Sequence, residues 1–282
     1  MARCDGVCQT DGDIRSDNPH RMAAEEIAPS NTALYGKVKV SSDCFMALLM
    51  LVLTAPLVVL AAFVVKLTSR GPIFYSQIRL GRGGKPFTIY KIRTMYHDCE
   101  KQTGAQWSKP GDSRVTPVGR FLRKSHIDEL PQLWNVLRTD MSLVGPRPER
   151  PEFVPQLEQA LNRYRERLLV RPGVSGLAQV QLPPDTDLNS VRRKLAHDLC
   201  YVERMSFWLD LRILVCTALH MLGLPYAASA KFLALPGGEP VERTYQDSLI
   251  KLSENEVVKN SVNETLNTVA TQAPHVPDLQ PA

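Results

Sequence analysis

The residues best suited to chemistry in this chain are two adjacent carboxylates, Asp128 and Glu129, which stand in a stretch rich in cations. Pro131 follows them, and because proline is tolerated only in the first turn of a helix, we predict that a helix begins near Asp128. Acidic residues at a helix start commonly act as caps or complement the helix dipole. The pair therefore has a structural interpretation as well as a catalytic one.

Nearby cations indicate which chemistry the pair would serve. Arg147 lies in a Gly-Pro-Arg-Pro stretch, where two prolines stiffen the loop, and its planar guanidinium suits phosphate oxygens. Lys91 ends a strand-like stretch and Arg123 precedes the carboxylates, and a solvated basic face is the plainer explanation of both. Carboxylates among cations would suit metal-assisted phosphoryl transfer, in which the protein positions groups and neutralises charge.

The segments that carry these residues have the periodicities of strands and helices. Residues 73–79 and 86–93 are β-rich and are joined by a turn with three glycines, which predicts a β-hairpin. No Gly-Lys-Ser/Thr motif follows, so we interpret the glycines as a turn and not as a phosphate cradle. Residues 151–169 and 188–205 have the pattern of amphipathic helices, and residues 207–222 that of an interfacial helix.

A membrane element is predicted at residues 44–65, which contain 22 consecutive uncharged residues. Pro56 lies just past its middle, so the segment is either a straight span or a helix that is broken there and returns to the same side. Basic residues stand on both flanks, so the positive-inside rule does not choose an orientation. They are Lys37, Lys39, Lys66 and Arg70. The polar residues before this segment are in the wrong order for a cleaved secretory signal.

The net charge of +5 is unevenly distributed along the 282 residues. Residues 37–225 carry 27 basic and 16 acidic residues, whereas both ends are acidic. Such an excess suits phosphorylated small molecules, an acidic membrane surface or nucleic acid, and charge alone does not choose among them. The six cysteines form no CxxC pair, and Cys4 and Cys8 lack the second ligand pair of a structural zinc site.

Four sequence blocks stand out between the predicted hairpin and the later helices. They are KPFTIYKIRTM (85–95), DSRVTPVGRFLRKSHIDELPQLWNVL (112–137), DMSLVGPRPERPEF (140–153) and RPGVSGLAQV (171–180). In order and spacing these blocks resemble the signature of the bacterial sugar transferase family, the monotopic phosphoglycosyl transferases that prime glycan synthesis. The resemblance extends from about Lys39 to Leu222.

The resemblance implies an α+β fold: a mostly helical monotopic membrane protein with a re-entrant N-terminal helix broken at Pro56, a small β-hairpin and interfacial amphipathic helices. We accordingly expect a mobile cytoplasmic segment at 1–36, the re-entrant helix at 37–70, the catalytic domain at 71–225 and a mobile tail at 226–282. Both termini would lie on the cytoplasmic side of the bacterial inner membrane.

The resemblance also implies a reaction and its residues. Asp128 would be the nucleophile that takes a phosphosugar from a UDP-sugar and releases UMP, with Glu129 as its dyad partner. Polyprenyl (undecaprenyl) phosphate would then accept the phosphosugar, in the first step of exopolysaccharide or other surface glycan synthesis. Lys91, Arg123 and Arg147 would bind phosphates, and Mg²⁺ would bind at Asp128 and Glu129.

The expected partners are the donor, the lipid acceptor, membrane lipid and downstream glycosyltransferases, with no nucleic acid; a homo-oligomer is left open. Three departures from the family pattern stand out: Leu177 replaces a tryptophan, the run 181–183 replaces Asn-Gly-Arg, and Ala55 replaces a hydroxyl residue before Pro56. The second affects a loop that would shape sugar choice, so the sugar is not predicted.

Two other functions remain open from the residues alone. A membrane-anchored scaffold or binding protein could use the basic middle without turnover, and it would not need Asp128. A nucleotide-sugar enzyme with a simple anchor would need a Rossmann-type glycine motif after an early strand, which the GRGG run at 81–84 does not supply.

Overall fold

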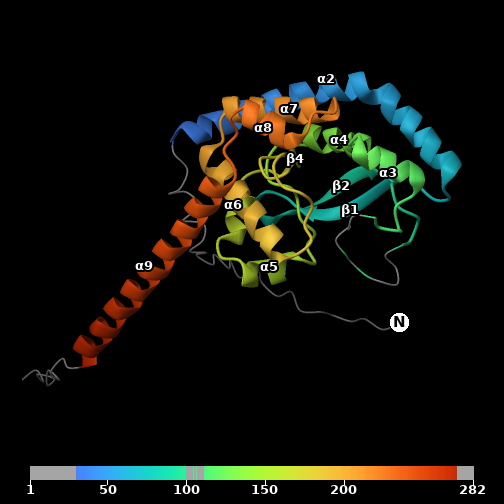
Figure 1. The fold of residues 1–282 in the computed structure, drawn as a ribbon. Coiled ribbons are helices and arrows are strands. Elements are labelled where there is room, and N and C mark those ends of the chain that lie inside the picture. The colour runs from blue at the N-terminus through green and yellow to red at the C-terminus, as the bar shows by residue number, and fades with distance from the viewer. Residues whose placement is uncertain (1–29, 100–103, 105, 107–110, 272–282) are drawn as a thin grey trace, which may run out of the picture.

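The computed structural model describes residues 30–99, 104, 106 and 111–271, and the side chains of these except 30–34, 37 and 256–271. Most of the predicted N-terminal segment, with Cys4 and Cys8, lies outside the described residues. The described chain is mostly helical and contains two small two-stranded sheets, so the predicted α+β class is confirmed (Figure 1).

The longest helix, α2 (Ser30–Thr68), forms one whole side of the molecule and bends along its length (Figure 1). Its residues Val38–Thr68 are long and apolar enough to cross a membrane, and only a small share of them is buried. Pro56 lies inside the helix, where its ring removes one backbone donor. Thr54 donates its hydroxyl to the Met50 carbonyl at 2.7 Å, a bond that also favours bending.

Both halves of α2 pack on the rest of the protein. Ala47 in the first half and Ala61 and Val65 in the second half are buried. Lys39, one of the basic residues that flank the uncharged run, is buried and pairs with Asp210 of α7. A carboxylate far along the chain thus neutralises this flanking cation.

The predicted hairpin is present as β1 (Phe74–Leu80) and β2 (Pro86–Ile92), joined through the 3-10 turn η1 (Arg82–Gly84). The strands are antiparallel, with Phe74 opposite Ile92. Asn135 caps the free edge of β2: its Oδ1 accepts from the Tyr90 amide at 3.2 Å and its Nδ2 donates to the Thr88 carbonyl at 2.7 Å. These bonds fix the hairpin against α4 (Gln132–Leu137).

Between the hairpin and α4 the chain forms α3 (Pro117–Lys124) and the 3-10 turn η2 (Ile127–Glu129). Thr116 caps α3 by accepting from the Gly119 amide at 2.9 Å. A Cβ atom at Gly119 would lie 2.0 Å from the Thr94 carbonyl oxygen, so only glycine lets α3 approach the chain after β2. The predicted helix start near Asp128 is thus a 3-10 turn, and the α-helix itself begins after Pro131.

The strands β3 (Ser142–Val144) and β4 (Gly173–Ser175) are parallel. The connection between them contains α5 (Val154–Ala160) and the 3-10 helix η3 (Tyr164–Leu169). We expected a single helix over 151–169, and this was wrong. Arg163, between the two, has a positive φ of 66°, and its guanidinium binds Glu166 and Glu203, so tertiary contacts turn the chain there.

The two predicted helices that follow are confirmed as α6 (Leu188–Arg204) and α7 (Phe207–Met221). Asp187 caps α6 by accepting from the Ser190 amide at 2.8 Å, and Ser206 caps α7. One face of α7 is buried, whereas Phe207, Trp208 and other apolar side chains on it are exposed.

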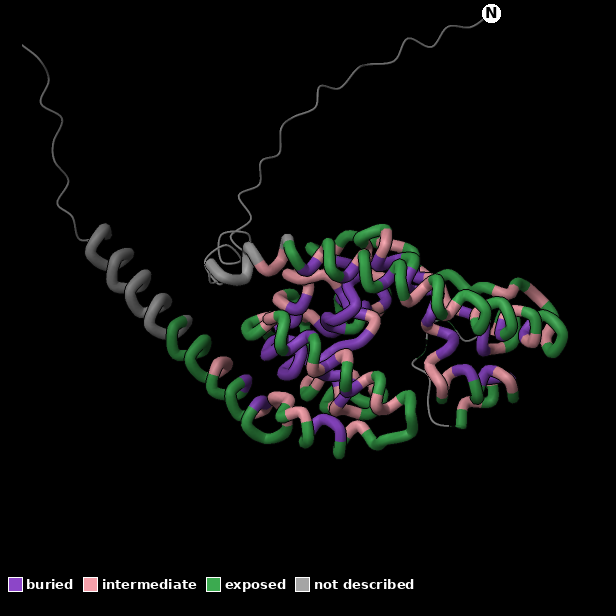
Figure 2. The backbone as a smooth tube through the Cα atoms, turned by 90° about the horizontal axis from the view of Figure 1, so that it is seen from above, coloured by how far each residue is buried: buried purple, intermediate pink, exposed green. Residues whose placement is uncertain are grey.

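The C-terminal region corrects the sequence analysis. No helix or strand was predicted in the tail at 226–282, but α8 (Tyr226–Phe232) and α9 (Glu239–Thr271) lie in it. The start of α9 packs on α6, with Val241 and Tyr245 buried, and the helix then extends away from the body (Figures 1 and 2). Residues 272–282 lie outside the described part.

A single hydrophobic core joins these elements (Figure 2). The largest fully buried side chains come from α2, β2, α4, the segment between α4 and β3, β3, the loop after β4, α6 and α7. They include Ile92, Leu133, Met141, Leu177, Leu195, Tyr201 and Ile213.

Candidate active site

The two candidate catalytic carboxylates lie on η2, directly after a strained residue. His126 has a φ of 54°, an uncommon conformation for a residue other than glycine, and such strain is often found at functional sites. Asp128 is 6% exposed, and its Oδ1 makes no hydrogen bond with any described residue. A buried carboxylate oxygen without a partner is costly to stability, and its retention points to a role beyond the fold.

Glu129 is held by two of the predicted phosphate-binding cations. Lys91 Nζ donates to Glu129 Oε1 at 2.7 Å, and Arg147 Nη2 donates to the same oxygen at 2.8 Å. Lys91 comes from β2 and Arg147 from the loop after β3, so the fold brings together three segments that are far apart in sequence. The structure thus places Asp128, Glu129, Lys91 and Arg147 at one site.

The same contacts shift the pKa values of the two carboxyl groups in opposite directions. The pKa of Asp128 is raised to about 6, mainly by burial and also by the neighbouring Glu129, while Lys91, Arg123 and Arg147 oppose the shift. Burial also acts on Glu129, but Arg147 and Lys91 hold the pKa of that carboxyl well below its usual range. Adjacent carboxyls with divergent pKa values are typical of sites in which each has a different role.

Arg123, the third predicted cation, also lies near the pair. Its Nε donates to Thr94 Oγ1 at 2.8 Å, which turns the side chain of α3 toward the end of β2. Its charge still lowers the pKa of Asp128, so Arg123 is within electrostatic reach of the candidate nucleophile.

The loop that carries Arg147 is rigidly held. The Gly145 amide donates to the Ser175 carbonyl at 2.9 Å, and the Gly173 amide donates to the Pro146 carbonyl at 2.9 Å. A Cβ atom at Gly173 would lie 2.1 Å from the Gly145 nitrogen, so this approach requires glycine. The loop is therefore tied to β4 on both sides of its turn.

A sequence model described as bacterial sugar transferase matches residues 34–223, about two thirds of the chain and all of the elements described above for the site. This chain belongs to the bacterial sugar transferase family.

Curated relatives of this sugar transferase have related names. It is 42% identical over 206 residues, 73% of its own length, to the UDP-N-acetylgalactosamine-undecaprenyl-phosphate N-acetylgalactosaminephosphotransferase of Aeromonas hydrophila. It is 40% identical over 66% of its length to a UDP-glucose:undecaprenyl-phosphate glucose-1-phosphate transferase of Xanthomonas campestris pv. campestris. An enzyme with that second name from Caulobacter vibrioides is 45% identical over 64% of this chain.

The matches cover different shares of the relatives. The sugar transferase spans 48% of the Aeromonas hydrophila protein and 39% of the Xanthomonas campestris protein, about half of their length or less. It spans 68% of the Caulobacter vibrioides protein. The names of the first two therefore describe longer chains than the one matched.

Sequence reasoning missed a buried ion pair next to the loop that carries Arg147. Arg167 of η3 pairs with Asp198 of α6 at 2.8 Å, and both side chains are almost fully buried. Arg167 also donates to the Tyr164 hydroxyl and to the Arg147 carbonyl, each at 2.8 Å. Arg167 stands four residues before the RPGVSGLAQV block, and this proximity is the one sequence signal that could have drawn attention to it.

A ring cluster beside the site was also missed. The His220 ring of α7 stacks on the Tyr226 ring of α8, with centroids 3.6 Å apart, and lies edge-on to His126 at 5.9 Å. Tyr226 lies beyond the end of the family match at residue 223. Nothing in its sequence context indicates a functional position.

The residues present fit a magnesium ion in a limited way. No group of three or more His, Cys, Asp or Glu side chains suited to a metal occurs in the described part of the chain. Mg²⁺ commonly uses only one or two carboxylates and completes its shell with substrate phosphates and water. Asp128 offers an unpartnered oxygen, and Glu129 is adjacent, so the pair fits an ion that arrives with a diphosphate.

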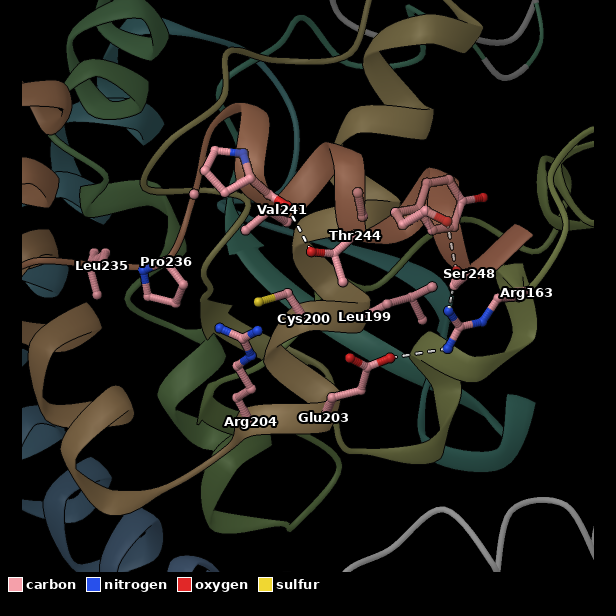
Figure 3. Close-up of a pocket in the computed structure, with 14 residues that line it drawn as sticks. Arg163, Leu199, Cys200, Glu203, Arg204, Leu235, Pro236, Val241, Thr244 and Ser248 are labelled. Atoms are coloured by element: carbon pink, nitrogen blue, oxygen red, sulfur yellow. Dashed lines mark hydrogen bonds and ion pairs between the residues drawn. The ribbon is translucent and has the colours of Figure 1, made fainter. Parts of the chain in front are cut away.

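A cavity of about 350 Å³ lies away from the dyad, between α6 and the first turns of α9 (Figure 3). Arg163 binds Glu203 and Ser248 at one end of it, and Arg204 and Cys200 lie beside one another in its wall (Figure 3). None of the predicted site residues lines this cavity.

Proposed function

We propose that the chain transfers a phosphosugar from a UDP-sugar to polyprenyl phosphate, giving polyprenyl-diphospho-sugar and UMP through a covalent intermediate on Asp128. One observation carries the proposal: a buried Asp128 carboxylate with a free oxygen stands beside Glu129, whose charge Lys91 and Arg147 neutralise. The names of the relatives, which specify UDP-sugar and undecaprenyl phosphate, support the choice of substrates.

In the first half-reaction an Asp128 oxygen attacks the phosphorus that carries the sugar. The bond between this phosphorus and the oxygen that bridges to the nucleotide phosphate breaks, and UMP leaves with that oxygen. Lys91, Arg147 and Arg123 would neutralise the charge that develops on the diphosphate. Because Lys91 and Arg147 pair with Glu129 without substrate, they are held ready in the site at little cost in side-chain ordering.

In the second half-reaction an oxygen of polyprenyl phosphate attacks the same phosphorus. The bond to Asp128 breaks and restores its carboxylate, and the product carries the sugar on a lipid diphosphate. Glu129 keeps the cations in place between the two steps, since its pKa is held far below neutral pH and its charge persists.

Asp128 and Glu129 would hold Mg²⁺ together with the donor diphosphate. When bound, the ion supplies Lewis-acid stabilisation of the phosphate oxygens. The assignment is supported by the unpartnered Asp128 oxygen and by the preference of Mg²⁺ for carboxylate and phosphate oxygen.

We further propose that α2 is re-entrant, with both termini and the domain of residues 71–225 on the cytoplasmic side of the inner membrane. Ala47 before Pro56 and Ala61 and Val65 after it are all packed on the catalytic elements. A helix that crossed the bilayer would carry one of these packed halves, and the polar elements on it, through the hydrocarbon core. A bent helix that enters one leaflet avoids this.

The experiment that tests the function measures UMP release by membranes that contain the protein, Mg²⁺, polyprenyl phosphate and one of a panel of UDP-sugars. We expect release with a particular sugar and its loss in Asp128→Asn, and we expect Lys66→Gln, a change on exposed α2 surface, to be active. Activity in Asp128→Asn close to wild type would contradict the covalent mechanism. Binding of donor and lipid without UMP release in the wild type would instead favour the non-catalytic scaffold.

The identity of the sugar would be decided by the same panel. Leu177, which replaces the usual tryptophan, is fully buried and packs in the core, so this departure alters packing beneath the loop and not an exposed contact. Gln181 donates to the Pro236 carbonyl at 2.7 Å, which ties that loop to the segment before α9. The product would serve a downstream glycosyltransferase.

A further inference from the structure

The ring cluster of His126, His220 and Tyr226 connects the candidate nucleophile to the corner between α7 and α8. His126 is two residues before Asp128, and its ring meets the edge of the His220 ring. His220 and Tyr226 are nearly parallel, with 15° between their planes. The cluster therefore extends from His126, two residues before Asp128, to the corner between α7 and α8.

Several polar atoms of the cluster make no hydrogen bond with the described residues. The Nδ1 atom of His220 lies 3.1 Å from the Leu224 carbonyl, which can only accept, so Nδ1 carries a proton and Nε2 is left over. Among the described residues, neither the Tyr226 hydroxyl nor the His126 ring makes a hydrogen bond. Burial raises the pKa of Tyr226 to about 12, with a contribution from Glu129, so this phenol stays protonated and lies near the dyad.

Exposed apolar side chains also lie at this corner. Met221, Leu222 and Leu224 are exposed there, and Leu222 is 79% exposed. Phe232 of α8 and Trp208 of α7 are exposed as well. Polar atoms between a reactive carboxylate and an exposed apolar surface form a boundary that suits a ligand with a charged head and a hydrocarbon tail.

We propose that His220 and Tyr226 bind the phosphate of the lipid acceptor as it approaches Asp128 from the apolar corner. The inference rests on the proposed function and adds acceptor-binding residues to it. His220 keeps its Nδ1–H on the Leu224 carbonyl and shares the proton of the acceptor phosphate through Nε2, and Tyr226 donates its hydroxyl. The stack fixes both rings before the lipid arrives, so little ordering is needed on binding.

The UDP-sugar has no need of these groups. Its diphosphate is served by Lys91, Arg123 and Arg147, which lie on the other elements around η2, and it carries no hydrocarbon chain. The two half-reactions should therefore depend on the cluster to different degrees, and this difference separates the proposal from a general structural role.

The test measures the two half-reactions separately on the full chain in detergent with Mg²⁺. Exchange of labelled UMP into UDP-sugar without acceptor reports the first, and the KM for polyprenyl phosphate reports the second. For His220→Ala we expect that KM to rise by about tenfold or more, as for loss of a charge-assisted hydrogen bond, with exchange within about twofold of wild type. Tyr226→Phe keeps the ring and loses the hydroxyl, and should raise the same KM by less.

His97→Ala removes an exposed histidine that pairs with Asp98, and it serves as the matched control that should leave both values unchanged. His220→Gln, which keeps an amide donor and is less disruptive, covers the case in which the alanine variant does not fold. An unchanged acceptor KM in His220→Ala, or exchange that falls as far as turnover, would overturn the proposal. Turnover without UMP exchange in the wild type would contradict the aspartyl intermediate, while the acceptor KM would still decide the role of His220.

Discussion

Arg167 donates a hydrogen bond from its Nη2 atom to the backbone carbonyl of Arg147 at 2.8 Å. The same guanidinium pairs with Asp198 of α6 and binds the Tyr164 hydroxyl. A buried arginine fork thus fixes the backbone of the residue whose own guanidinium reaches Glu129. Arg167 therefore fixes the loop that carries Arg147, in addition to the two prolines of that loop.

Arg167 should therefore affect activity through Arg147. Arg167→Lys keeps the charge that Asp198 needs but loses the planar fork, and we expect kcat/KM for the UDP-sugar to fall by about tenfold. In an Arg147→Ala background the same change should have less than about a twofold effect, since residues that act through one another are not additive. Arg163→Lys, a change in a nearby arginine that does not touch the loop, is the control. Additive losses in the double variant would contradict the positioning role.

Arg147→Ala should weaken donor use directly. Loss of a guanidinium that binds developing phosphate charge typically costs on the order of a hundredfold, so we expect about that decrease in kcat/KM for the UDP-sugar. Steady-state kinetics of UMP release measures it. The pairing of Glu129 with Lys91 remains in this variant, so the expression level and thermal midpoint should stay near those of wild type.

Asp128→Asn should stabilise the fold at neutral pH while it abolishes turnover. The folded pKa is about 6 against an ordinary value near 3.8, so ionisation is penalised in the folded state. This penalty is absent below about pH 4, grows as the pH rises toward 6 and is complete above it, where it amounts to at most about 3 kcal/mol. The asparagine variant lacks it.

Thermal unfolding of both proteins across pH 4–8 in metal-free buffer measures this difference. The midpoint of the variant should exceed that of wild type by several degrees at pH 8, and the two should converge near pH 4. A constant offset across this range would show that Asp128 is not the titrating group.

The pairing of Lys39 with Asp210 should hold α2 against α7. Lys39 lies close to both Asp210 and Asp43, and Asp210 also accepts from the Tyr201 hydroxyl at 2.8 Å. Lys39→Met leaves buried carboxylates without a cation, a loss that commonly costs about 3–5 kcal/mol, and we expect the thermal midpoint to fall by at least about 5 °C. Lys66→Met, on the exposed surface of the same helix, should change it by about 1 °C or less. Equal effects of the two substitutions would refute the role of the pair.

The orientation of α2 can be tested by chemical labelling. Single cysteines at Val38 and Arg70, both exposed and on opposite sides of Pro56, are introduced into a chain without its native cysteines. If α2 is re-entrant, a membrane-impermeant maleimide should label neither in intact cells and both after lysis. Labelling of one of them from outside would establish a membrane span.

The local features of this protein could be predicted from its amino-acid sequence. The uncharged run around Pro56, the glycine turn of the hairpin and the capped helices α6 and α7 follow from residue types and short-range spacing, and each is present in the structure. The identity of Asp128, Glu129, Lys91, Arg123 and Arg147 as candidates also came from the sequence, through motif order.

The pairing of distant charged residues could be seen only in the tertiary structure. Three contacts join residues that are 20 to 171 positions apart, and no local pattern encodes such separations. They are the ion pair of Lys39 with Asp210, the hydrogen bond from Arg167 to the Arg147 carbonyl and the ring contact of His220 with His126. The same reason explains the two errors of secondary structure. Arg163 turns the chain inside a helical pattern because distant partners bind it, and α9 begins as a helix where Tyr245 packs against the rest of the fold. Local periodicity predicts an element, whereas burial of charge and apolar surface between elements decides where it begins, ends and acts.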